Sequence, residues 1–545
     1  MHHPAGADAG AGRVTMRPLD HVQGNTMRAY PGLALLLILA APAAWAAAPQ
    51  SAPAKLQGLD GYVQHVMRDW HVPGLGLAIV EDGKVVLARG YGVRELGKPA
   101  KVDADTLFDI GSNSKAFTVA ALGTLVSAGK LDWNTPVTDE LEDFKLESPY
   151  VTQHVTLRDL LTHRTGYCDP GAAWYTGDAD GIVHRMRWQE PEYGFRTTFC
   201  YNNVQYLAAS RFIPAITGKS WNDYVAAQLF QPLDMARTVG TEAGVATASN
   251  VATPHGKVDG KPAVIHRYWP HNMDVFAAVG GIWSSANDMS HWMQMLLANG
   301  QYDGKRVLDR QVVDAMETPQ VLIRSGTGVG DEIRAWMPGG TFYTYGMGLF
   351  VQDDHGHGIV WHAGDIDGMA SAVVLVPEAH LGIVVMENMD HAEARFAIVA
   401  RVLQAMLDLP PHDLEPALLA AVRKDETRSA AMDKKFAATR ERASKPPLPL
   451  ADYAGNYSDK LAGNARVALE HGHLVLRLGN PDFTGDLEPW HDNTFRVTWR
   501  YRFYGDDYAT FDVDALKRPL RLTLAGMSLH FDRTKSPTPS HTSPK

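Results

Sequence analysis

The sequence predicts an α/β domain whose sheet is assembled from both ends of that domain, followed by a small all-β domain. Three features indicate this order. Apolar runs typical of strands occur early and late in the first domain, capped helices lie between them, and short β-rich segments follow a proline-rich break. Helices enclosed by strands favour one sheet over two separate ones.

The first elements are predicted to be a helix and a β-hairpin. Residues 59–70 carry apolar side chains at steps of three and four, the spacing of one helix face, and Pro73-Gly74 ends that pattern. The apolar runs at 75–80 and 84–88 flank Asp82-Gly83, a dipeptide that favours a tight turn between antiparallel strands. The sheet is therefore expected to begin with these two strands.

The middle of the domain is predicted to be helical. Three Ser or Thr residues stand three positions before an aspartate and ahead of an apolar stripe, which is the pattern of a capped helix start. These pairs are Thr156 with Asp159, Ser220 with Asp223, and Ser285 with Asp288. The later segments 358–362, 369–376 and 381–387 have the composition of strands joined by short turns.

Composition divides the remainder of the chain. The first domain is expected over residues 47–410, and residues 411–447, rich in Ala, Lys, Arg and Glu until Pro446-Pro447, predict a helical connector. A small β-barrel or sandwich is predicted over 448–535, and a disordered tail rich in Ser, Pro and Thr over 536–545. The β-rich segments are 465–469, 473–478, 494–503, 508–513 and 520–531.

Residues 1–46 have the organisation of a signal peptide preceded by an N-terminal extension. The apolar run over 33–44 is too short to span a bilayer as a helix. Arg28 supplies a positive charge, residues 33–39 the apolar centre, and Ala44-Trp45-Ala46 a small-x-small cleavage site. Translation is then expected to start near Met27. We expect an exported protein, periplasmic or secreted. An uncleaved membrane anchor is the alternative, and it also places the mature part outside the cytosol.

The charge of the chain bears on its partners. Its 545 residues include 61 acidic and 51 basic side chains, which gives a formal net charge of −10. This balance works against nucleic acid as a partner, because such binding depends on a basic face that displaces counterions. We expect a small-molecule or short-peptide substrate, for which the cell wall is one source. The oligomeric state is left open.

The chain has two cysteines, Cys168 and Cys200. In an oxidising compartment an isolated pair of this kind can form one disulfide. Two buried free thiols are the alternative, because sequence gives no distance between the two residues.

Ser112 and Lys115 form a candidate nucleophile and base. They stand where a helix is predicted to begin, and positions three apart on a helix are neighbours, so the amine can reach the hydroxyl. The positive end of the helix dipole disfavours an ammonium and favours a developing oxyanion. Spacing alone is weak evidence, because Ser127 and Lys130 repeat it and a capping serine beside a solvated lysine gives the same pattern.

Four segments together are more specific than any one of them. They are Phe108-Asp109-Ile110-Gly111-Ser112-Asn113-Ser114-Lys115, Thr156-Leu157-Arg158-Asp159-Leu160-Leu161-Thr162-His163-Arg164-Thr165-Gly166, Tyr201-Asn202-Asn203 and His362-Ala363-Gly364. Their order and separations resemble the serine β-lactamase and penicillin-binding-protein superfamily over residues 56–405. Within it, the chain is most similar to the class C β-lactamase-related branch of esterases, D-amino-acid peptidases and carboxypeptidases. The resemblance implies the β-lactamase/transpeptidase fold, an antiparallel sheet flanked by helices plus an all-helical region.

This resemblance also implies a role for each motif residue. Ser112 is expected to be acylated, with Lys115 and Tyr201 sharing general-base and proton-transfer duty. A phenol beside a lysine can have its pKa lowered, which suits this role. Asn203 is expected to orient both the substrate amide and Lys115.

The third motif is where the chain departs from many β-lactamases and transpeptidases. His362 and Gly364 are expected to line the sheet edge, and the backbone N–H groups of Ser112 and Asp365 to form the oxyanion hole. His362 stands where those enzymes carry the lysine of Lys-Thr/Ser-Gly. A histidine is only partly charged near neutrality, so it would hold a substrate carboxylate less firmly, which favours ester or peptide substrates over β-lactams.

The C-terminal domain resembles the small barrel appended to many relatives of this branch, on the segments 453–457 and 487–495. Shaping the substrate entrance, supporting an oligomer and capping the first domain are the roles that such a barrel can have.

Two other hydrolase classes fit less well. Asp353, Asp354, His355 and His357 lie close together ahead of His362 and raise the question of a metal site, but glycines alternate with them and no H-E-x-x-H occurs, so a solvated turn is favoured. An α/β-hydrolase needs a serine with glycine two positions to each side, which this chain lacks. We expect no metal and no organic cofactor.

The sequence thus predicts a serine hydrolase that acts through an acyl-enzyme on ester or amide substrates, D-amino-acid peptides and β-lactam-like compounds included. The alternative is a penicillin-binding or sensor-type protein that is acylated at Ser112 and turns over poorly, because release of the acyl group needs a separately activated water.

Overall fold

The computed structural model describes residues 54–171, 179–266, 273–438, 440 and 445–534. The predicted signal peptide over 1–46 and the predicted tail over 536–545 lie outside these residues. Within the described ranges, no helix combines the length and the apolar character needed to cross a membrane.

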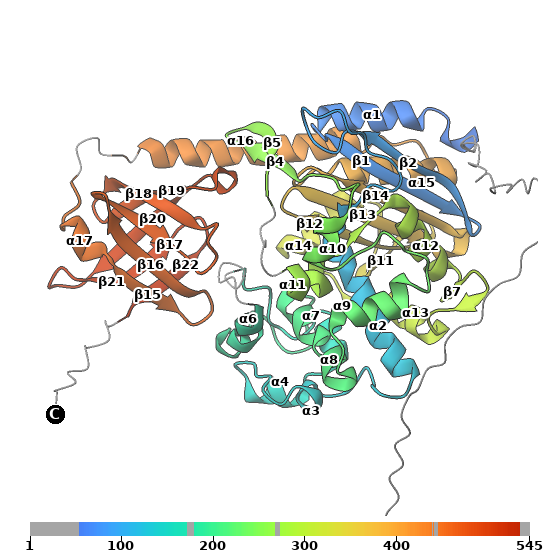
Figure 1. Cartoon of the computed structure of the whole chain (residues 1–545), viewed down its shortest axis with the longest axis horizontal. Helices are drawn as coiled ribbons and strands as arrows, with labels where there is room; N and C mark the ends of the chain where they lie inside the picture. Colours follow the sequence, from blue (N-terminus) through green and yellow to red (C-terminus); the bar gives the residue numbers. More distant parts are fainter. Residues whose placement is uncertain (1–53, 172–178, 267–272, 439, 441–444, 535–545) are drawn as a thin grey trace, which may run out of the picture. The chain divides into compact units, whose positions relative to one another are not determined.

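An eight-stranded antiparallel sheet forms the centre of the first domain, in the order β2-β1-β14-β13-β12-β11-β10-β9 (Figure 1). The early hairpin pairs directly with the last strand, with Leu77 opposite Val385. The predicted sheet assembled from both ends is therefore confirmed. The strands are β1 Gly74–Glu81, β2 Lys84–Gly92, β9 Val321–Leu322, β10 Tyr343–Tyr345, β11 Phe350–Asp354, β12 His357–Ile366, β13 Met369–Val376 and β14 Leu381–Glu387.

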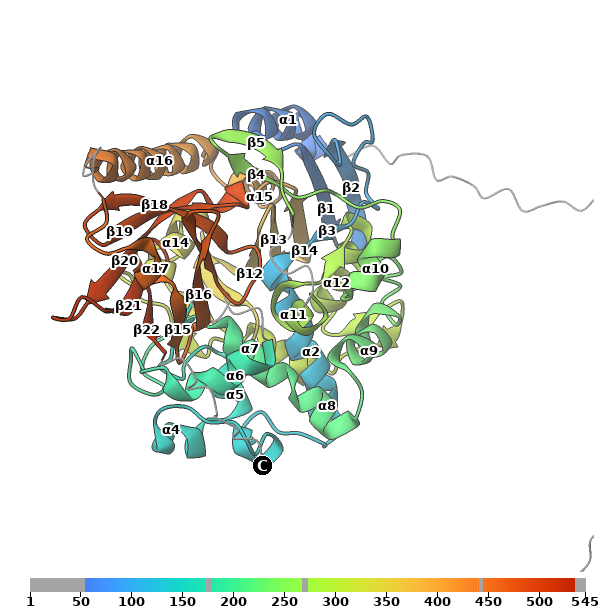
Figure 2. The ribbon, with the colours of Figure 1, turned by 60° about the vertical axis from the view of Figure 1, so that its left-hand side comes forward.

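Helices cover both faces of this sheet, so its inner strands are continuously apolar rather than alternating. Every residue of β13 and β14 is buried. Alternate residues face opposite ways, and Val373 and Leu375 of β13 pack in one core while Val374 and Val376 pack in the other. In Figures 1 and 2, α1 (Leu59–Asp69) and α2 (Ser114–Ser127) lie on opposite sides of β14.

The segment between β2 and β9 is mostly helical, as predicted. Its helices, in chain order, are α2, α3 Val137–Glu140, α4 Pro149–His154, α5 Leu157–Leu161, α6 Ala179–Arg185, α7 Asn203–Ser210, α8 Phe212–Thr217, α9 Trp221–Val225, α10 Glu242–Thr247, α11 Met273–Gly280, α12 Ala286–Leu297 and α13 Arg310–Glu317. The three predicted caps are present, because the side chains of Thr156, Ser220 and Ser285 each accept the N–H of the aspartate three residues later. Three two-stranded sheets also occur in this part of the chain. They pair β3 Phe108–Asp109 with β6 Trp283–Ser284, β4 His255–Val258 with β5 Lys261–Val264, and β7 Gln301–Tyr302 with β8 Lys305–Arg306.

Three helices complete the domain and lead out of it. They are α14 Gly328–Trp336, α15 Ala394–Met406 and the long α16 Glu415–Ala438, which is the helix predicted in the connector. The short α17 Leu450–Tyr453 then precedes the C-terminal strands.

The C-terminal strands form a closed eight-stranded barrel, which decides between the predicted barrel and sandwich. Tyr453, Tyr457, Phe495, Phe511 and Phe531 fill its interior. The strands are β15 Gly455–Asp459, β16 Gly463–Glu470, β17 His473–Arg477, β18 Thr484–His491, β19 Thr494–Trp499, β20 Asp506–Val513, β21 Pro519–Leu524 and β22 Leu529–Arg533.

Two of the predicted barrel strands are wrong as single elements. The segment 494–503 leaves the sheet after Trp499 and enters the 3-10 turn η7 (Arg502–Tyr504). The segment 520–531 is a hairpin, because the chain reverses after Leu524, with Ser528 in the left-handed region. Neither turn was predicted, because apolar residues continue through both of them.

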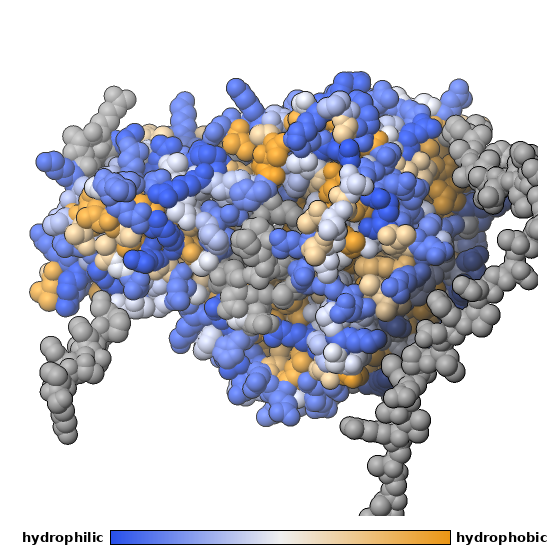
Figure 3. Space-filling view, viewed as in Figure 1, coloured by the Kyte–Doolittle hydropathy of each residue, from blue (hydrophilic) through white to orange (hydrophobic). Residues whose placement is uncertain are grey.

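Figure 3 shows one face of the molecule, on which hydrophobic residues occur in small groups among hydrophilic ones. Large exposed side chains such as Tyr150, Phe342 and Leu516 come from separate parts of the chain. This distribution is ordinary for a protein surface and by itself identifies no site.

A buried carboxylate holds the helical region together. Asp159 closes the capping box of α5 and is fully buried. Its two oxygens also accept hydrogen bonds from Arg164 Nε at 2.7 Å and Arg196 Nη2 at 2.6 Å. The pKa of Asp159 is lowered, because these partners and the Thr156 backbone outweigh the effect of burial. This cluster links the segment around α5 to the chain that leads into α7.

We predict that Asp159→Ala lowers the free energy of unfolding by about 3 kcal/mol or more, because two arginines lose their buried partner along with the cap. Urea denaturation measures the difference. Asp223→Ala is the matched control, since Asp223 closes the corresponding cap at Ser220 but is exposed, and it should cost about 1 kcal/mol or less. Equal losses in the two variants would contradict a role for the arginine contacts.

Candidate active site

The turn that carries Ser112 lies against the sheet. Gly111 has a positive φ of 52°, and a Cβ there would lie 2.6 Å from the backbone nitrogen of Asp365 on β12. Only glycine therefore allows this approach. From the other side, Ser371 Oγ of β13 accepts a hydrogen bond from Asn113 Nδ2 at 2.8 Å and donates one to Ile110 O at 2.7 Å. The start of α2 is thus fixed to β12 and β13.

Lys115 is the second residue of α2, one helical turn after Ser112, and its amine is directed at the serine. Nζ lies 2.8 Å from Ser112 Oγ and donates to the carbonyl oxygen of Val279 at 2.8 Å. The residue is fully buried. Burial lowers the pKa of Lys115 to about 7, and the carboxylate of Asp169 opposes this effect. A large fraction of the amine is therefore neutral near pH 7 and able to accept a proton.

Tyr201 contacts the same hydroxyl from another direction. Its OH donates to Ser112 Oγ at 2.9 Å, and Lys115 Nζ lies 5.0 Å from the centre of its ring. Burial raises the pKa of Tyr201, which is opposite to the lowering that the sequence led us to expect. Burial is the main cause, and the nearby carboxylates of Asp169 and Asp365 add to it. Tyr201 is therefore a protonated donor, whereas Lys115 is the neighbour of Ser112 that can accept a proton near pH 7.

Asp169 holds the Tyr201-Asn202-Asn203 turn in place. Its N–H donates to Tyr201 O at 2.8 Å, and its Oδ2 accepts from the Asn203 backbone N–H at 3.0 Å and from Asn203 Nδ2 at 2.7 Å. Asn203 was expected to orient Lys115, but its amide donates to Asp169, and the amine of Lys115 has Ser112 and Val279 as its partners. The influence of Asn203 on Lys115 thus runs through Asp169.

A disulfide joins the two chain segments at this point. Cys168 and Cys200 are bonded, with Cα atoms 4.9 Å apart and a sequence separation of 32. Asp169 and Tyr201 follow directly after the two cysteines, so the bridge ties the tyrosine to the segment that supports it.

The buried ring of His163 packs against the ring of Tyr201. Its ring lies 4.4 Å from the Tyr201 ring, and its Nδ1 accepts the backbone N–H of Asn202 at 3.0 Å. Burial lowers the pKa of His163 well below its usual value, and electrostatic interaction with the ionisable groups of Lys115 and His362 adds to the effect. The ring is therefore neutral and adds no charge beside the lysine.

The third motif contributes less to the cavity surface than expected. His362 is 2% exposed, and its Nε2 lies 3.2 Å from the OH of Tyr345. Burial, with Lys115 nearby, lowers the pKa of His362 to about 3, so it is neutral near pH 7. Gly364 packs on the nucleophile turn, where a Cβ would collide with Ile110 O. Neither residue is among those that line the cavity within the described chain.

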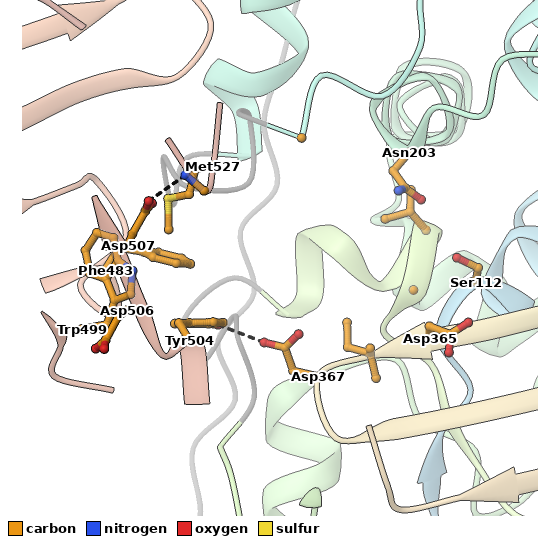
Figure 4. A pocket seen from close by; sticks show the side chains of 15 residues that line it. Ser112, Asn203, Asp365, Asp367, Phe483, Trp499, Tyr504, Asp506, Asp507 and Met527 are labelled. Carbon is orange, nitrogen blue, oxygen red and sulfur yellow. Dashed lines mark hydrogen bonds between the residues drawn. The ribbon is translucent and has the colours of Figure 1, made fainter. Parts of the chain in front are cut away.

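A cavity of about 540 Å³ opens beside Ser112 (Figure 4). The first domain contributes Ser112, Asn203 and Asp365 to its lining, and the barrel contributes aromatic residues that include Phe483 and Tyr504. The barrel therefore forms part of the wall that a substrate would meet.

The strand that lines the cavity has a free edge. Pairing of β11 with β12 ends at Phe350 opposite Trp361, whereas β13 continues to pair as far as Ile366. Among the described residues, 362–366 thus pair with a strand on one side only. An edge of this kind can align an extended substrate by backbone hydrogen bonds.

A buried arginine fixes that edge. Arg395 of α15 is fully buried and contacts both carboxylate oxygens of Asp365, at 2.8 and 3.0 Å. It also lies 3.2 Å from Glu393. The backbone N–H of Asp365, the expected second oxyanion donor, is therefore on a rigid segment.

The residues considered for a metal site do not converge. His355 and His357 lie at the exposed hairpin between β11 and β12, where His355 contacts Asp354 and His357 contacts Glu378. His362 is buried farther along β12. The solvated turn favoured from sequence therefore describes this segment.

Sequence reasoning missed four residues of this site. Val279 O acts through its backbone, and Arg395, Asp169 and His163 act through other residues. His163 lies within a quoted motif, and Asp169 next to a cysteine, which are the signals that could have drawn attention to them. Nothing in the sequence around Val279 or Arg395 indicates their contacts.

We predict that kcat/KM for a neutral ester rises as the pH increases through about 7, because Lys115 can accept the serine proton only when it is neutral. Initial rates across pH measure this. Asp169→Asn should move the rise to lower pH, since the carboxylate that favours the ammonium is removed. A profile that does not change across neutral pH would contradict the assignment of Lys115 as the base.

We predict that the Cys168→Ala/Cys200→Ala double variant loses about 2–4 kcal/mol of folding free energy, as expected for a bridge that closes a loop of this length. Denaturation with and without reductant measures it. Reductant should bring the unmodified protein to the stability of the variant and leave the variant unchanged. Two reactive thiols in the unfolded, unreduced protein would show that the bridge is not formed.

Comparison with known proteins agrees with this geometry. Residues 59–406 match the family described as "Beta-lactamase", and residues 439–537 match a domain of unknown function, DUF3471. Unguisins hydrolase ungD′ of Aspergillus campestris is 30% identical over 427 residues, which cover 72% of this chain and 74% of that protein. Unguisins hydrolase ungD of Aspergillus violaceofuscus is 26% identical, with 75% and 76% covered.

A solved structure, the octameric penicillin-binding protein homologue from Pyrococcus abyssi, superposes with a TM-score of 0.56 at 21% identity, over 86% of this chain and 97% of that one. This likeness supports the fold alone. The fold and the resemblance predicted from sequence are thus confirmed, and the chain belongs to the beta-lactamase family of the serine β-lactamase and penicillin-binding-protein superfamily.

Proposed function

We propose that this protein is a serine hydrolase that forms an acyl-enzyme at Ser112 with ester or amide substrates. The observation that carries the proposal is the pair of contacts to one hydroxyl oxygen, from Lys115 Nζ at 2.8 Å and from Tyr201 OH at 2.9 Å. One partner is a base that is neutral in part near pH 7, and the other is a protonated donor.

Acylation follows from these two states. The neutral amine of Lys115 accepts the proton of Ser112 while Oγ attacks the substrate carbonyl carbon. The backbone N–H groups of Ser112 and Asp365 bind the resulting oxyanion. The tetrahedral adduct then collapses, the bond to the leaving group breaks, and Tyr201 gives its proton to the leaving oxygen or nitrogen and regains one from Lys115.

Deacylation uses the same groups in the same roles. Lys115 is neutral again, because the proton that it took from Ser112 has passed through Tyr201 to the leaving group. Water then takes the place of the leaving group and attacks the carbonyl carbon of the acyl-enzyme ester, while Lys115 accepts a proton from this water. Ser112 leaves as the alcohol and is reprotonated through Tyr201. The net reaction adds one water across the ester or amide bond.

The third motif favours substrates without a carboxylate next to the scissile bond. His362 is buried and neutral, so the chain has no fixed ammonium at this place. This supports ester or peptide substrates over β-lactams. Two relatives are named unguisins hydrolases, which is consistent with hydrolysis as the overall activity.

The proposed setting is outside the cytosol. The predicted signal peptide favours export, and the bond between Cys168 and Cys200 suits an oxidising compartment. A small molecule or a short peptide is the proposed substrate, because the cavity of about 540 Å³ has the volume of a small-ligand site.

Intact-mass spectrometry during turnover of a p-nitrophenyl ester and of a penicillin tests the proposal. We predict a transient acyl adduct with continued release of p-nitrophenol in the unmodified protein, and neither in Ser112→Ala. Lys115→Ala should slow acylation by about a thousandfold. Lys130→Ala, the exposed lysine of the second S-x-x-K pattern, is the matched control and should act normally.

The outcomes separate the two candidate functions. A stable adduct without product release would favour the sensor, since deacylation would then be missing. Turnover in Ser112→Ala would overturn the assignment of the nucleophile.

A further inference from the structure

The charged side chains that line the cavity are all acidic. Within the described residues they are Asp365, Asp367, Asp506 and Asp507, with no lysine, arginine or histidine among the lining residues. Asp365 is paired with Arg395, and Asp506 with Arg496 and Arg502. These two carboxylates are neutralised by the protein itself.

The other two carboxylates are held by neutral donors. Asp507 accepts the backbone N–H groups of Gly526 and Tyr508 at 2.7 and 2.6 Å. Asp367 accepts the OH of Tyr504 at 2.9 Å, a contact visible in Figure 4. None of the ion pairs among the described residues includes either aspartate. Within the described part of the chain, these two carboxylates of the cavity are thus without an ion-pair partner, and His391 acts on Asp367 only through its charge at a distance.

Burial of Asp367 without an ion-pair partner among the described residues affects the free energy of its ionised form. Burial raises the pKa of its carboxyl to about 6, and Asp390 adds to the effect more than His391 opposes it. A cation bound beside Asp367 would favour the ionised form. A positively charged ligand would therefore supply at this place the ion-pair partner that the described residues do not give Asp367.

Aromatic rings stand beside this carboxylate. Tyr504 stacks on Phe483 with ring centres 4.5 Å apart, and Phe483 packs edge-on against Trp499 at 5.5 Å. Phe483 and Trp499 belong to the barrel core, so this wall is rigid. Carboxylate and aromatic faces together are the chemistry that binds alkylammonium groups.

Contacts with the first domain fix the position of Tyr504. Tyr504 lies on η7, and the neighbouring Arg502 pairs with Asp259 at 2.9 Å in the turn between β4 and β5. Gly256 of β4 lies against Phe503, where a Cβ would come within 2.5 Å of the ring. The barrel loop is thus anchored on the domain that carries Ser112.

The distance of Asp367 from the reaction suits a substrate subsite. Asp365, whose N–H is the proposed oxyanion donor, stands two residues earlier on the strand that ends at Ile366. Two residues of extended chain span about 7 Å. A group bound at Asp367 is therefore several bonds away from the scissile carbonyl and takes no part in the chemistry.

We propose that Asp367 and the aromatic wall around Tyr504 form a subsite for a positively charged alkylammonium group of the substrate. This inference rests on the proposed hydrolase function and deepens it by naming a substrate class, cationic esters or amides. It assigns to the barrel a part in substrate selection.

Three p-nitrophenyl esters of matched size test the subsite, with kcat/KM as the readout. They are the ester of γ-trimethylammonio-butyrate, its carbon isostere with a tert-butyl group, and the monoester of glutarate. We expect the cationic ester to exceed the neutral one by about tenfold, with the anionic ester the poorest. The permanent charge of the first ester removes any ambiguity about its protonation.

Variants test whether the preference for the cationic ester depends on Asp367 and Tyr504. Asp367→Asn should bring the ratio of cationic to neutral ester close to one while leaving the neutral ester within about twofold, and Tyr504→Leu should lower the ratio through loss of the ring. Asp512→Asn, which removes the same charge from an exposed position on β20, should keep the full ratio. This control excludes an effect of net charge.

An unchanged ratio in Asp367→Asn, or preference for the glutarate ester, would overturn the subsite. Hydrolysis of the neutral ester that depends on Ser112 would then still support the proposed function. If no ester acylates Ser112 in the unmodified protein, the proposed function fails, and the subsite inference with it.

Discussion

The site depends on taking one amine out of water. The amine of Lys115 can accept a proton near pH 7 only because its side chain is enclosed by the protein, with a serine hydroxyl and a backbone carbonyl as its polar neighbours. Much of the surrounding structure serves this condition. His163 and His362, which could each have introduced a second charge, are buried and neutral, and Tyr201 keeps its proton. A cluster of titratable groups thereby contains one that changes state near neutral pH.

The sequence predicted the fold well where periodicity and turn chemistry carry the information. The helix at 59–70, the hairpin around Asp82-Gly83 and the caps at Thr156, Ser220 and Ser285 are all local features, and the structure has them. The barrel turns at 500–505 and 525–528 were missed, since apolar residues continue through them.

The residues of the site that lie in the sequence motifs could be predicted. Ser112, Lys115 and Tyr201 were found in the same hydroxyl-centred geometry that the motif order implied. The direction of the pKa change at Tyr201 was not predictable, because it depends on how completely three-dimensional packing excludes water. The same holds for Arg395, whose partner Asp365 is 30 positions away in sequence, and for Asp367, which gains its aromatic neighbours from another domain.

The topology of the sheet delays the appearance of the nucleophile during folding. Ser112 is encoded early, but the turn that presents it is held by Ser371, 258 positions beyond Asn113, and the central strand β14 comes later still. Contacts so distant in sequence form slowly, and they cannot form on a chain that is still incomplete. A nascent chain therefore carries Ser112 as an ordinary hydroxyl, and its contacts with Lys115 and Tyr201 arise only when the whole domain has closed around it.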